Sequence, residues 1–347
     1  MSDPAVVGLD VGGTSTRAAV FTLAGERLGA GRAGGGNPTS HGGQAAAAQL
    51  RAALAEALAA VDPARVRAAT IGLAGAGRLT ADPAARAAFD RAWHDVGLRC
   101  PYRLVGDQLV AYASATAAED GTVLIAGTGA VAAQIRGMTV DRCADGHGWL
   151  LGDAGSGFWL GRQAVRRLLA DLDRRREPTP LGRLVLAELL GAPEPSDGPR
   201  ETVDALIQTV TRRPAVHLAA LAPLVVRAQR EGDGAAGRIL AEAARLLTES
   251  VARIRPRGER TPVVLAGGLL TGDAPLAEQV GRLVRARWPR APLLNARDGA
   301  AGAAWLAART LTEVRDPVEL HRRLLGPTQG AARALSGDHG TAAATAE

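Results

Sequence analysis

Short apolar runs alternate with longer stretches of helical periodicity along the first third of the chain. Apolar runs of strand length occupy residues 5–12, 16–22, 27–33, 66–75 and 102–107. Residues 44–61 are rich in alanine and leucine, which favour a helix of about five turns, and residues 81–97 form a second helical stretch. The pattern predicts three strands in an antiparallel meander, then a helix, a strand, a helix and a strand.

A second cycle of strands and helices follows. Residues 122–137 hold two apolar strands around a glycine–threonine turn, and residues 156–175 have the pattern of a helix. Residues 176–200 are rich in proline and polar side chains, so we expect an irregular surface excursion there. Helical periodicity returns over residues 201–255. The last predicted elements are a strand, a helix, and a closing strand with its helix, at residues 261–272, 276–288 and 292–310. The repeated layout suggests duplicated halves.

The length of 347 residues exceeds what a single hydrophobic core normally supports, so we expect two domains. Residues 1–109 are assigned to an N-terminal domain and residues 110–325 to a C-terminal domain, whose final helix is able to pack back on the first. Residues 326–347 have no periodicity and are expected to be a disordered tail. A ligand site is expected in the cleft between the two domains.

Arginine supplies all of the basic side chains except histidine, because the sequence contains no lysine. This excludes the Walker phosphate loop and the protein-kinase fold, since both need a lysine on the phosphates. The formal net charge is +6, and the arginines are scattered among alanines along predicted helices. Such a distribution is typical of a solvated surface, so no nucleic-acid partner is expected.

Several other classes are excluded by what the sequence lacks. Cys100 and Cys143 are isolated, which argues against a zinc ribbon, a redox pair or a disulfide framework. No apolar run reaches the roughly 18 residues that a membrane span requires, and no stretch has the build of a secretion signal. We therefore expect a cytoplasmic protein without a membrane partner.

Three glycine turns each follow a predicted buried strand. They are Gly12-Gly13-Thr14, Gly127-Thr128-Gly129 and Gly267-Gly268. Successive backbone amides in such turns can converge on an anion, because no Cβ atom blocks its approach. Asp10 directly precedes the first turn and is placed to orient a hydrated Mg²⁺, which accepts few carboxylates and keeps several waters. Each turn taken alone could also be an ordinary tight turn.

The glycine turns also carry a family resemblance. The stretches LDVGGTSTR, IAGTG and VLAGGL resemble the two phosphate motifs and the adenosine motif of the actin and sugar-kinase ATPase superfamily. The match is closest to its N-acetylglucosamine kinase branch, which includes the BadF/BadG/BcrA/BcrD-type ATPases. The resemblance extends over roughly residues 5–310. It implies an α/β fold of two RNase H-like domains, as in actin-like ATPases, with ATP and Mg²⁺ bound in an interdomain active-site cleft.

Three further segments resemble the sugar-binding and catalytic parts of that branch. They are GGGNP at 34–38, LVGDQLVAYASA at 104–115 and GWLLGDAGSGFWLG at 148–161. The resemblance makes Asp107 the base that accepts the proton of the sugar hydroxyl, and Asn37 a direct contact of the sugar. Without the family, Asp107 could instead be the N-cap of a helix that starts at Gln108, and Asn37 could be a turn residue before Pro38.

The third segment supplies the remaining sugar contacts that the resemblance implies. These are Gly148, Trp149 and Asp153, with Thr128 able to reach either phosphate or sugar. Asp153 could alternatively be an N-cap for the helix near Ser156.

Two positions depart from the family pattern. The family's GDEGS glutamate is Ala154 here, and the tryptophan six residues before the aspartate is His147. Both border the expected sugar pocket, so a free amino sugar or another hexose derivative is an alternative to N-acetylglucosamine. His147 could also be an ordinary loop histidine.

We therefore predict an ATP-dependent kinase of an amino sugar, N-acetylglucosamine or glucosamine, with adenosine against Gly267 and Gly268. A homodimer is a candidate assembly by resemblance. Two alternatives use the same fold. A dehydratase-activating ATPase would need cysteine ligands for an iron–sulfur cluster, which Cys100 and Cys143 do not resemble. A sugar-sensing regulator would carry a DNA-binding helix pair before the first phosphate strand, which begins here by residue 5.

Overall fold

The structure is a computed structural model that describes residues 3–192, 194, 198–272 and 274–326. The described chain forms two compact units, the first made of residues 3–117 and 297–326 and the second of residues 118–296. The sequence pattern instead predicts a boundary after residue 109, with residues 297–325 in the second domain. The expected disordered tail lies, apart from Gly326, outside the described residues.

The first unit is built on a five-stranded mixed sheet in the order β3-β2-β1-β4-β5. β1 pairs antiparallel with β2 and β2 with β3, whereas β4 and β5 run parallel to β1. The strands are β1 (Ala5–Val11), β2 (Thr16–Thr22), β3 (Arg27–Ala33), β4 (Val66–Leu73) and β5 (Tyr102–Gly106). The predicted meander and the two strands that follow it are therefore confirmed.

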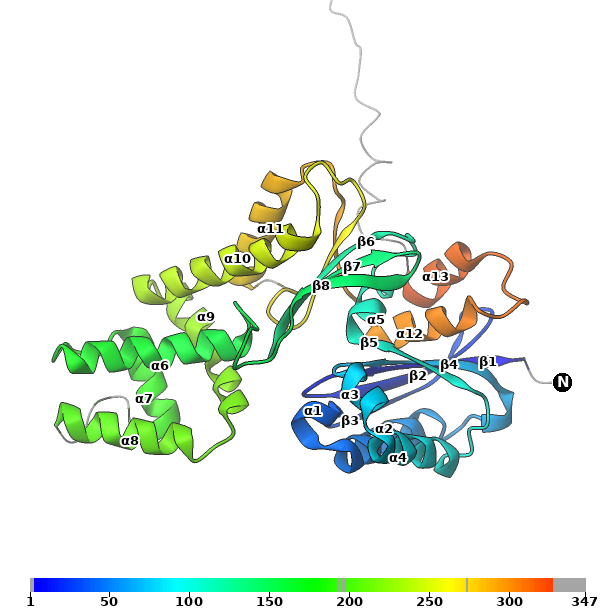
Figure 1. Ribbon diagram of the computed structural model, residues 1–347, viewed down its shortest axis with the longest axis horizontal. Coiled ribbons are helices and arrows are strands. Elements are labelled where there is room, and N and C mark those ends of the chain that lie inside the picture. Colours follow the sequence, from blue (N-terminus) through cyan, green and yellow to red (C-terminus); the bar gives the residue numbers. More distant parts are fainter. Residues whose placement is uncertain (1–2, 193, 195–197, 273, 327–347) are drawn as a thin grey trace, which may run out of the picture. The chain divides into compact units, whose positions relative to one another are not determined.

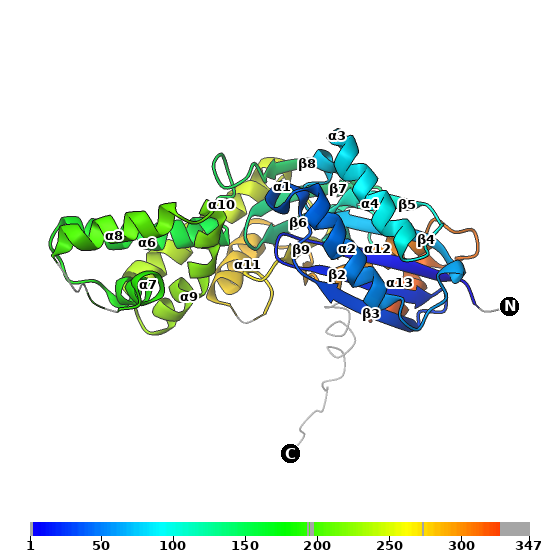
Figure 2. The same cartoon turned by 90° about the horizontal axis from the view of Figure 1, so that it is seen from below.

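Helices cover both faces of this sheet (Figure 1). α2 and α4 lie side by side across one face (Figure 2), while α12 and α5 cover the other. The helical elements of the unit are α1 (Pro38–His41), α2 (Gly43–Ala57), η1 (Pro63–Arg65), α3 (Ala76–Ala81), α4 (Pro83–Asp95), α5 (Asp107–Ala113), α12 (Gly299–Ala308) and α13 (Pro317–Leu325). Helices α1, α3 and α13 are not predicted by the sequence pattern.

A glycine in β1 explains why α12 belongs to the first unit. A Cβ atom on Gly8 would lie 2.0 Å from the carbonyl oxygen of Ala300 and 2.1 Å from the amide nitrogen of Ala304. The helix backbone therefore rests directly on the strand, and every residue of α12 is buried. This close approach joins the end of the described chain to its beginning.

The second unit repeats the same sheet arrangement, with the order β10-β9-β6-β7-β8. β6 and β7 pair antiparallel, as do β7 and β8, whereas β9 and β10 run parallel to β6. The strands are β6 (Gly121–Ala126), β7 (Ala130–Arg136), β8 (Thr139–Asp145), β9 (Val263–Ala266) and β10 (Leu293–Asn295). The two units thus share one topology, and the predicted α/β fold class with two RNase H-like units is confirmed.

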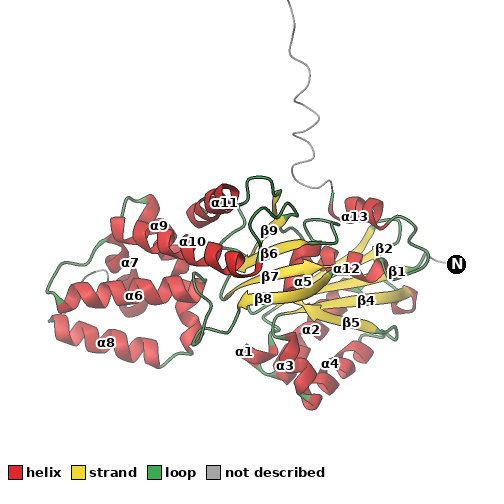
Figure 3. Ribbon diagram, turned by 45° about the horizontal axis from the view of Figure 1, so that its top comes forward, coloured by secondary structure: helices red, strands yellow, loops and turns green. Residues whose placement is uncertain are grey.

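A group of helices extends beyond the second sheet within this unit (Figure 3). The helical elements of the whole second unit are α6 (Gly157–Asp173), α7 (Pro180–Leu190), α8 (Pro199–Thr211), η2 (Ala215–Leu221), α9 (Ala222–Arg230), α10 (Gly234–Ile254) and α11 (Pro275–Arg287). The prediction of an irregular excursion over residues 176–200 was wrong, because α7 lies within it. Thr179 caps this helix, Pro180 occupies its first turn, and Leu181 and Val185 are buried.

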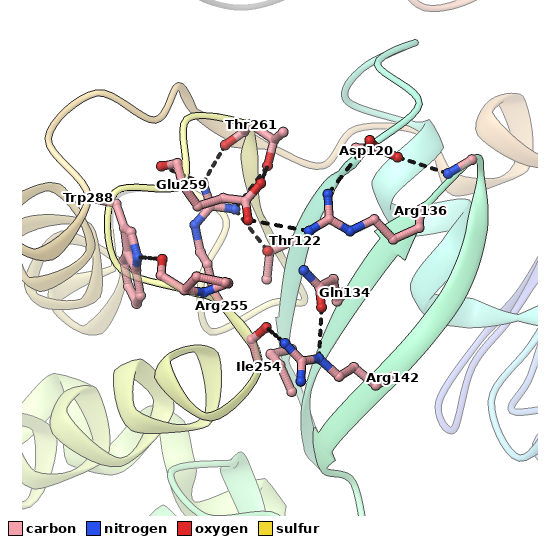
Figure 4. Close-up of polar contacts among 12 residues, drawn as sticks. Asp120, Thr122, Gln134, Arg136, Arg142, Ile254, Arg255, Glu259, Thr261 and Trp288 are labelled. Carbon is pink, nitrogen blue, oxygen red and sulfur yellow. Dashed lines mark hydrogen bonds and ion pairs between the residues drawn. The ribbon is translucent and has the colours of Figure 1, made fainter.

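A buried arginine fixes the second sheet at the end where β6 and β9 begin (Figure 4). Arg255 donates hydrogen bonds to the hydroxyl of Thr122, 2.9 Å away, and to the backbone oxygens of Glu259 and Thr261. Its guanidinium group also lies 5.7 Å from the ring centre of Trp288. The two strands joined in this way are those that lead to the second and third glycine turns.

No helix among the described residues combines the length and the apolar character that crossing a bilayer would require.

Candidate functional site

The parallel strands of the first sheet end in a row. Val11 lies opposite Leu73, and Leu73 lies opposite Gly106. Open α/β sheets place ligands at the carboxyl ends of such strands. Asp107 directly follows Gly106, so its backbone lies two strand spacings, about 10 Å, from the first glycine turn.

The first glycine turn has no structural reason to contain glycine. A Cβ atom on Gly13 would meet no atom within 4 Å, and one on Gly12 would meet only the carbonyl oxygen of Ser15, at 3.5 Å. Neither glycine has a positive φ. Within the described residues, no protein group accepts a hydrogen bond from the amides of Gly13 and Thr14. The turn therefore offers open space and available donors to a ligand.

The predicted sugar loop is hydrogen-bonded to this turn. The amide of Gly36 donates to the carbonyl oxygen of Gly12 at 3.0 Å. The hydroxyl of Thr16 donates to the carbonyl oxygen of Gly34 at 2.9 Å. These two bonds bring residues 34–38 and the first glycine turn together into one local structure.

His41 adds a third link between loop and turn. Its Nε2 atom lies 2.8 Å from the carbonyl oxygen of Gly13, so the ring must donate this hydrogen bond. A Cβ atom on Gly35 would lie 2.2 Å from the same oxygen, which explains the glycine at that position. No sequence motif predicts this role of His41.

Asn37 is the N-cap of α1, with its Oδ1 atom accepting a hydrogen bond from the amide of Thr39 at 2.8 Å. Pro38 follows in the first turn, so the reading of Asn37 as a turn residue describes its local role. A Cβ atom on Gly75 would lie 2.8 Å from the same Oδ1. The side-chain amide nitrogen of Asn37 has no protein acceptor among the residues that the structure describes, and it remains a donor for a ligand.

Asp10 and Asp107 form a half-buried pair of carboxylates. The pKa of Asp107 is raised to about 7, first by burial and then by the nearby charge of Asp10, against hydrogen bonds from the amides of Gln108 and Asp107 itself. Burial likewise raises the pKa of Asp10 to about 6, partly offset by Arg17. The alternative role of Asp107 as a helix cap is wrong, because α5 begins at Asp107 and its N-cap is Gly106.

This carboxylate pair predicts an unusual pH dependence of stability. Both pKa values lie above the value of about 3.9 expected in the unfolded chain. Between about pH 4 and about pH 7 the folded state therefore binds more protons than the unfolded state. The free energy of unfolding decreases as the pH rises through this range. Asp107→Asn should therefore raise the free energy of unfolding by about 2 kcal/mol at pH 8 and leave it nearly unchanged at pH 4. Urea denaturation of both proteins across this range, without nucleotide or metal, measures the difference. A lower stability of the variant at pH 8 would contradict the assigned burial.

The second glycine turn resembles the first in its open space. A Cβ atom on Gly127 would meet no atom within 4 Å. Its amide donates to the carbonyl oxygen of Gly129 at 2.9 Å, while the amides of Gly157 and Phe158 at the start of α6 bond the carbonyl oxygens of Gly127 and Thr128. Within the described part of the chain, the amides of Thr128 and Gly129 have no protein acceptor.

Asp153 lies against this second turn. Its Oδ1 atom accepts a hydrogen bond from the amide of Ala130 at 3.2 Å, and a Cβ atom on Gly129 would lie 2.9 Å from its Oδ2. Burial raises the pKa of Asp153. The alternative role as a helix cap is wrong, because Ser156 caps α6 by accepting the amide hydrogen of Trp159.

The loop before Asp153 exposes apolar side chains. Trp149 is 43% exposed and its ring lies 5.5 Å from that of Phe158, while Leu150 and Leu151 are 72% and 79% exposed. Gly148 has a φ of +84°, a left-handed conformation that favours glycine. His147 is exposed on the same loop.

The third glycine turn contains two different kinds of glycine. Gly267 has a φ of +86°, and its Cβ atom would lie 2.3 Å from the carbonyl oxygen of Ala126, so the fold itself requires glycine there. A Cβ atom on Gly268 would meet nothing within 4 Å. Gly268 lines a hollow of about 490 Å³ together with Val226 and Arg227 of α9. The predicted adenosine contact is thus open at Gly268, whereas Gly267 has a local packing role.

Comparison with known proteins gives one family and several relatives. A model of the BadF/BadG/BcrA/BcrD ATPase family matches residues 7–307. N-acetyl-D-glucosamine kinase of Dictyostelium discoideum is 29% identical over 213 residues, which cover 59% of this chain and 65% of that protein. N-acetylmuramic acid/N-acetylglucosamine kinase of Clostridium acetobutylicum is 26% identical over 213 residues, 60% of this chain and 67% of that protein. The match therefore spans less than two thirds of the Dictyostelium enzyme.

One solved structure supports the likeness in three dimensions. A candidate N-acetylglucosamine kinase from Chromobacterium violaceum is 26% identical and aligns with a TM-score of 0.68, over 88% of this chain and 99% of that one.

Proposed function

From the premise that the chain belongs to the BadF/BadG/BcrA/BcrD ATPase family, we propose that it is an ATP-dependent kinase of an amino sugar. It would transfer the terminal phosphoryl group of ATP to a hydroxyl group of N-acetylglucosamine or glucosamine. The observation that carries this proposal is in the first unit. There, a glycine turn with open space and available amides is hydrogen-bonded to the loop of Asn37, at the sheet edge where Asp107 follows β5.

Backbone amides hold the phosphates in this proposal. The amides of Gly13, Thr14, Thr128 and Gly129 supply donors in the two open turns, and Gly12 and Gly127 keep side chains away from the anion. Because the sequence has no lysine, main-chain donors replace the ammonium group on which many nucleotide sites depend. The hollow beside Gly268 would receive adenosine.

A magnesium ion fits the residues present beside the first turn. The Asp10 carboxylate lies close to Asp107. A Cβ atom on Gly299 would be only 2.5 Å from Oδ2 of Asp10. Hard oxygen donors of this kind suit Mg²⁺, and a cation would relieve the repulsion between the two carboxylates. Asp10 would hold the ion, mainly through water. The ion would neutralise the charge of the phosphates when bound.

Asp107 would act on the sugar hydroxyl. A carboxylate within hydrogen-bond reach orients the hydroxyl and accepts its proton as the bond to phosphorus forms. The raised pKa of about 7 makes Asp107 a stronger base than an exposed aspartate. Asn37 and Asp153 would bind the other sugar hydroxyls, with Thr128, Gly148 and Trp149 completing the contacts.

The identity of the sugar depends on the loop of residues 146–155. The exposed His147 and the small Ala154 replace an aromatic and an acidic side chain of the family pattern. Less aromatic surface is then available to an acetamido group, so glucosamine competes with N-acetylglucosamine as the proposed substrate.

The proposal is tested by coupled measurement of ADP release with five sugars: glucosamine, N-acetylglucosamine, N-acetylmuramic acid, N-acetylmannosamine and glucose. We expect ADP release that depends on an amino sugar, and a phosphorylated sugar of matching amount detected by mass spectrometry. ADP release that is independent of every sugar would reject the kinase assignment. The Asp107→Asn variant serves as the inactive control.

A further inference from the structure

Asp145 is a buried aspartate with no role in the kinase function proposed above. It is the last residue of β8 and is 7% exposed. Its φ is +64°, a left-handed conformation that is rare for residues other than glycine. Such strain costs about 1–3 kcal/mol and persists only where the surrounding structure holds it.

The Asp145 carboxylate fastens both ends of the loop that follows it. Its Oδ1 atom accepts the amide hydrogens of Gly146 at 2.8 Å and Asp153 at 2.6 Å, and its Oδ2 accepts that of Ala154 at 2.9 Å. A Cβ atom on Gly152 would lie 2.3 Å from Oδ1, so the loop backbone closes tightly over the carboxylate. One side chain thus holds together the two ends of residues 146–154.

The residue held in this way is the proposed sugar ligand. Asp153 itself has a φ of +56°, so its backbone is also strained. Its carboxylate bonds the amide of Ala130 and lies against Gly129 of the second glycine turn. The chain of contacts therefore runs from Asp145 to the backbone of Asp153 and on to the turn.

We infer that Asp145 is a positioning residue that sets the affinity of the site for sugar by fixing the backbone of Asp153 and the loop 146–155. This inference rests on the proposed kinase function. Asp145 acts through other residues and touches neither substrate. Its removal should therefore weaken sugar binding far more than nucleotide binding.

The chain offers a matched control in Asp233. This aspartate is 6% exposed and also belongs to the second unit. Its carboxylate also accepts three amide hydrogens, from Leu181 at 2.8 Å, Ala235 at 2.7 Å and Ala236 at 3.0 Å. It caps α10, and none of these three hydrogen bonds involves a residue of the proposed sugar site, so we expect its loss to lower stability without changing sugar affinity.

The test compares Asp145→Asn and Asp145→Ala with Asp233→Asn. Asparagine keeps one oxygen for the amides of Gly146 and Asp153 but turns a donor toward the amide of Ala154. Because misplacement of a binding group by about 1 Å can cost up to about 100-fold, we expect Asp145→Asn to raise the KM for the sugar by about 10-fold and Asp145→Ala by about 100-fold. The KM for ATP should change by less than about 3-fold, since the phosphate amides of Gly13 and Thr14 belong to the other unit and have no contact with the Asp145 carboxylate among its hydrogen bonds.

Two further measurements separate positioning from general destabilisation. Thermal melting should show similar losses for Asp145→Asn and Asp233→Asn. Hydrogen exchange of residues 146–156 in the sugar-free protein should accelerate in Asp145→Asn and stay unchanged in Asp233→Asn.

The outcomes distinguish this inference from the function on which it rests. If the wild-type protein phosphorylates an amino sugar but Asp145→Asn and Asp233→Asn have the same KM for it, the positioning role is overturned and the kinase function stands. If the wild-type protein shows no sugar-dependent ADP release, the kinase function and the sugar role of Asp145 are both rejected. If Asp145→Ala does not fold, the comparison with Asp145→Asn decides.

Discussion

Asp107→Asn is expected to lower the kcat of sugar phosphorylation by a factor of about 10³, with the KM for ATP within about 3-fold of the wild-type value. Asparagine has the shape of aspartate and still accepts a hydrogen bond from the sugar hydroxyl, but it cannot take the proton. The nucleotide contacts its own turns through backbone amides, which the substitution does not alter. Steady-state kinetics with saturating amino sugar measure the effect.

The same substitution should make the protein more stable at neutral pH, because it removes a half-buried carboxylate whose pKa is raised to about 7. Greater stability with lower activity is characteristic of a residue kept for function. Asp82→Asn is a suitable control, since Asp82 caps α4 in the same unit. It removes a carboxylate but keeps the capping oxygen, so it should leave kcat unchanged and should not raise stability. If Asp107→Asn kept more than a tenth of the wild-type kcat, Asp107 would not be the base.

Gly13→Ala is expected to raise the KM for ATP by about 10- to 100-fold, the range of a misplaced binding group. The added methyl group would occupy the space in which the phosphates approach the amides. No protein atom lies within 4 Å of that Cβ position, so the folded structure itself should accommodate alanine. Stability should stay unchanged or rise by up to about 1 kcal/mol, because alanine restricts the unfolded chain. Kinetics over a range of ATP concentrations, together with thermal melting, measure both quantities.

Two other glycines calibrate this prediction. Gly237 in α10 also has open space around its Cβ position, so Gly237→Ala should leave both KM values unchanged. Gly8 rests against the backbone of α12, and Gly8→Ala should therefore lower the melting temperature markedly. If Gly13→Ala bound ATP as well as Gly237→Ala does, the open space at the first turn would not be a phosphate site.

Strands with a continuous apolar run could be predicted from the sequence, whereas β8 could not. β1 and β6 are buried on both faces, so their sequences contain few polar residues. β8 is an edge strand whose residues 139–143 are largely exposed, so it lacks an apolar run. The helix α7 was missed for another reason. Its prolines suggested a loop, but Pro180 stands at the first turn of the helix, where its missing amide hydrogen costs nothing.

The positions of the glycine turns and of Asp107 could be predicted from the sequence because each directly follows a strand. Asp145 could not, because its role depends on amides eight and nine residues further along the chain, which only the folded loop brings back to it. Its one sequence signal is an aspartate placed before a glycine at the start of a glycine-rich loop. The packing roles of Gly8 and Gly267 also depend on distant backbone and leave no trace in local pattern.

The return of α12 to β1 has a consequence for biosynthesis. Synthesis proceeds from the N-terminus, so the first sheet emerges from the ribosome long before the helix that covers one of its faces. The intervening second unit has all of its strands in one continuous segment and can fold as soon as that segment is released. The first unit then becomes complete only after α12 has been released, and a nascent chain arrested before residue 299 would present an apolar sheet surface to chaperones.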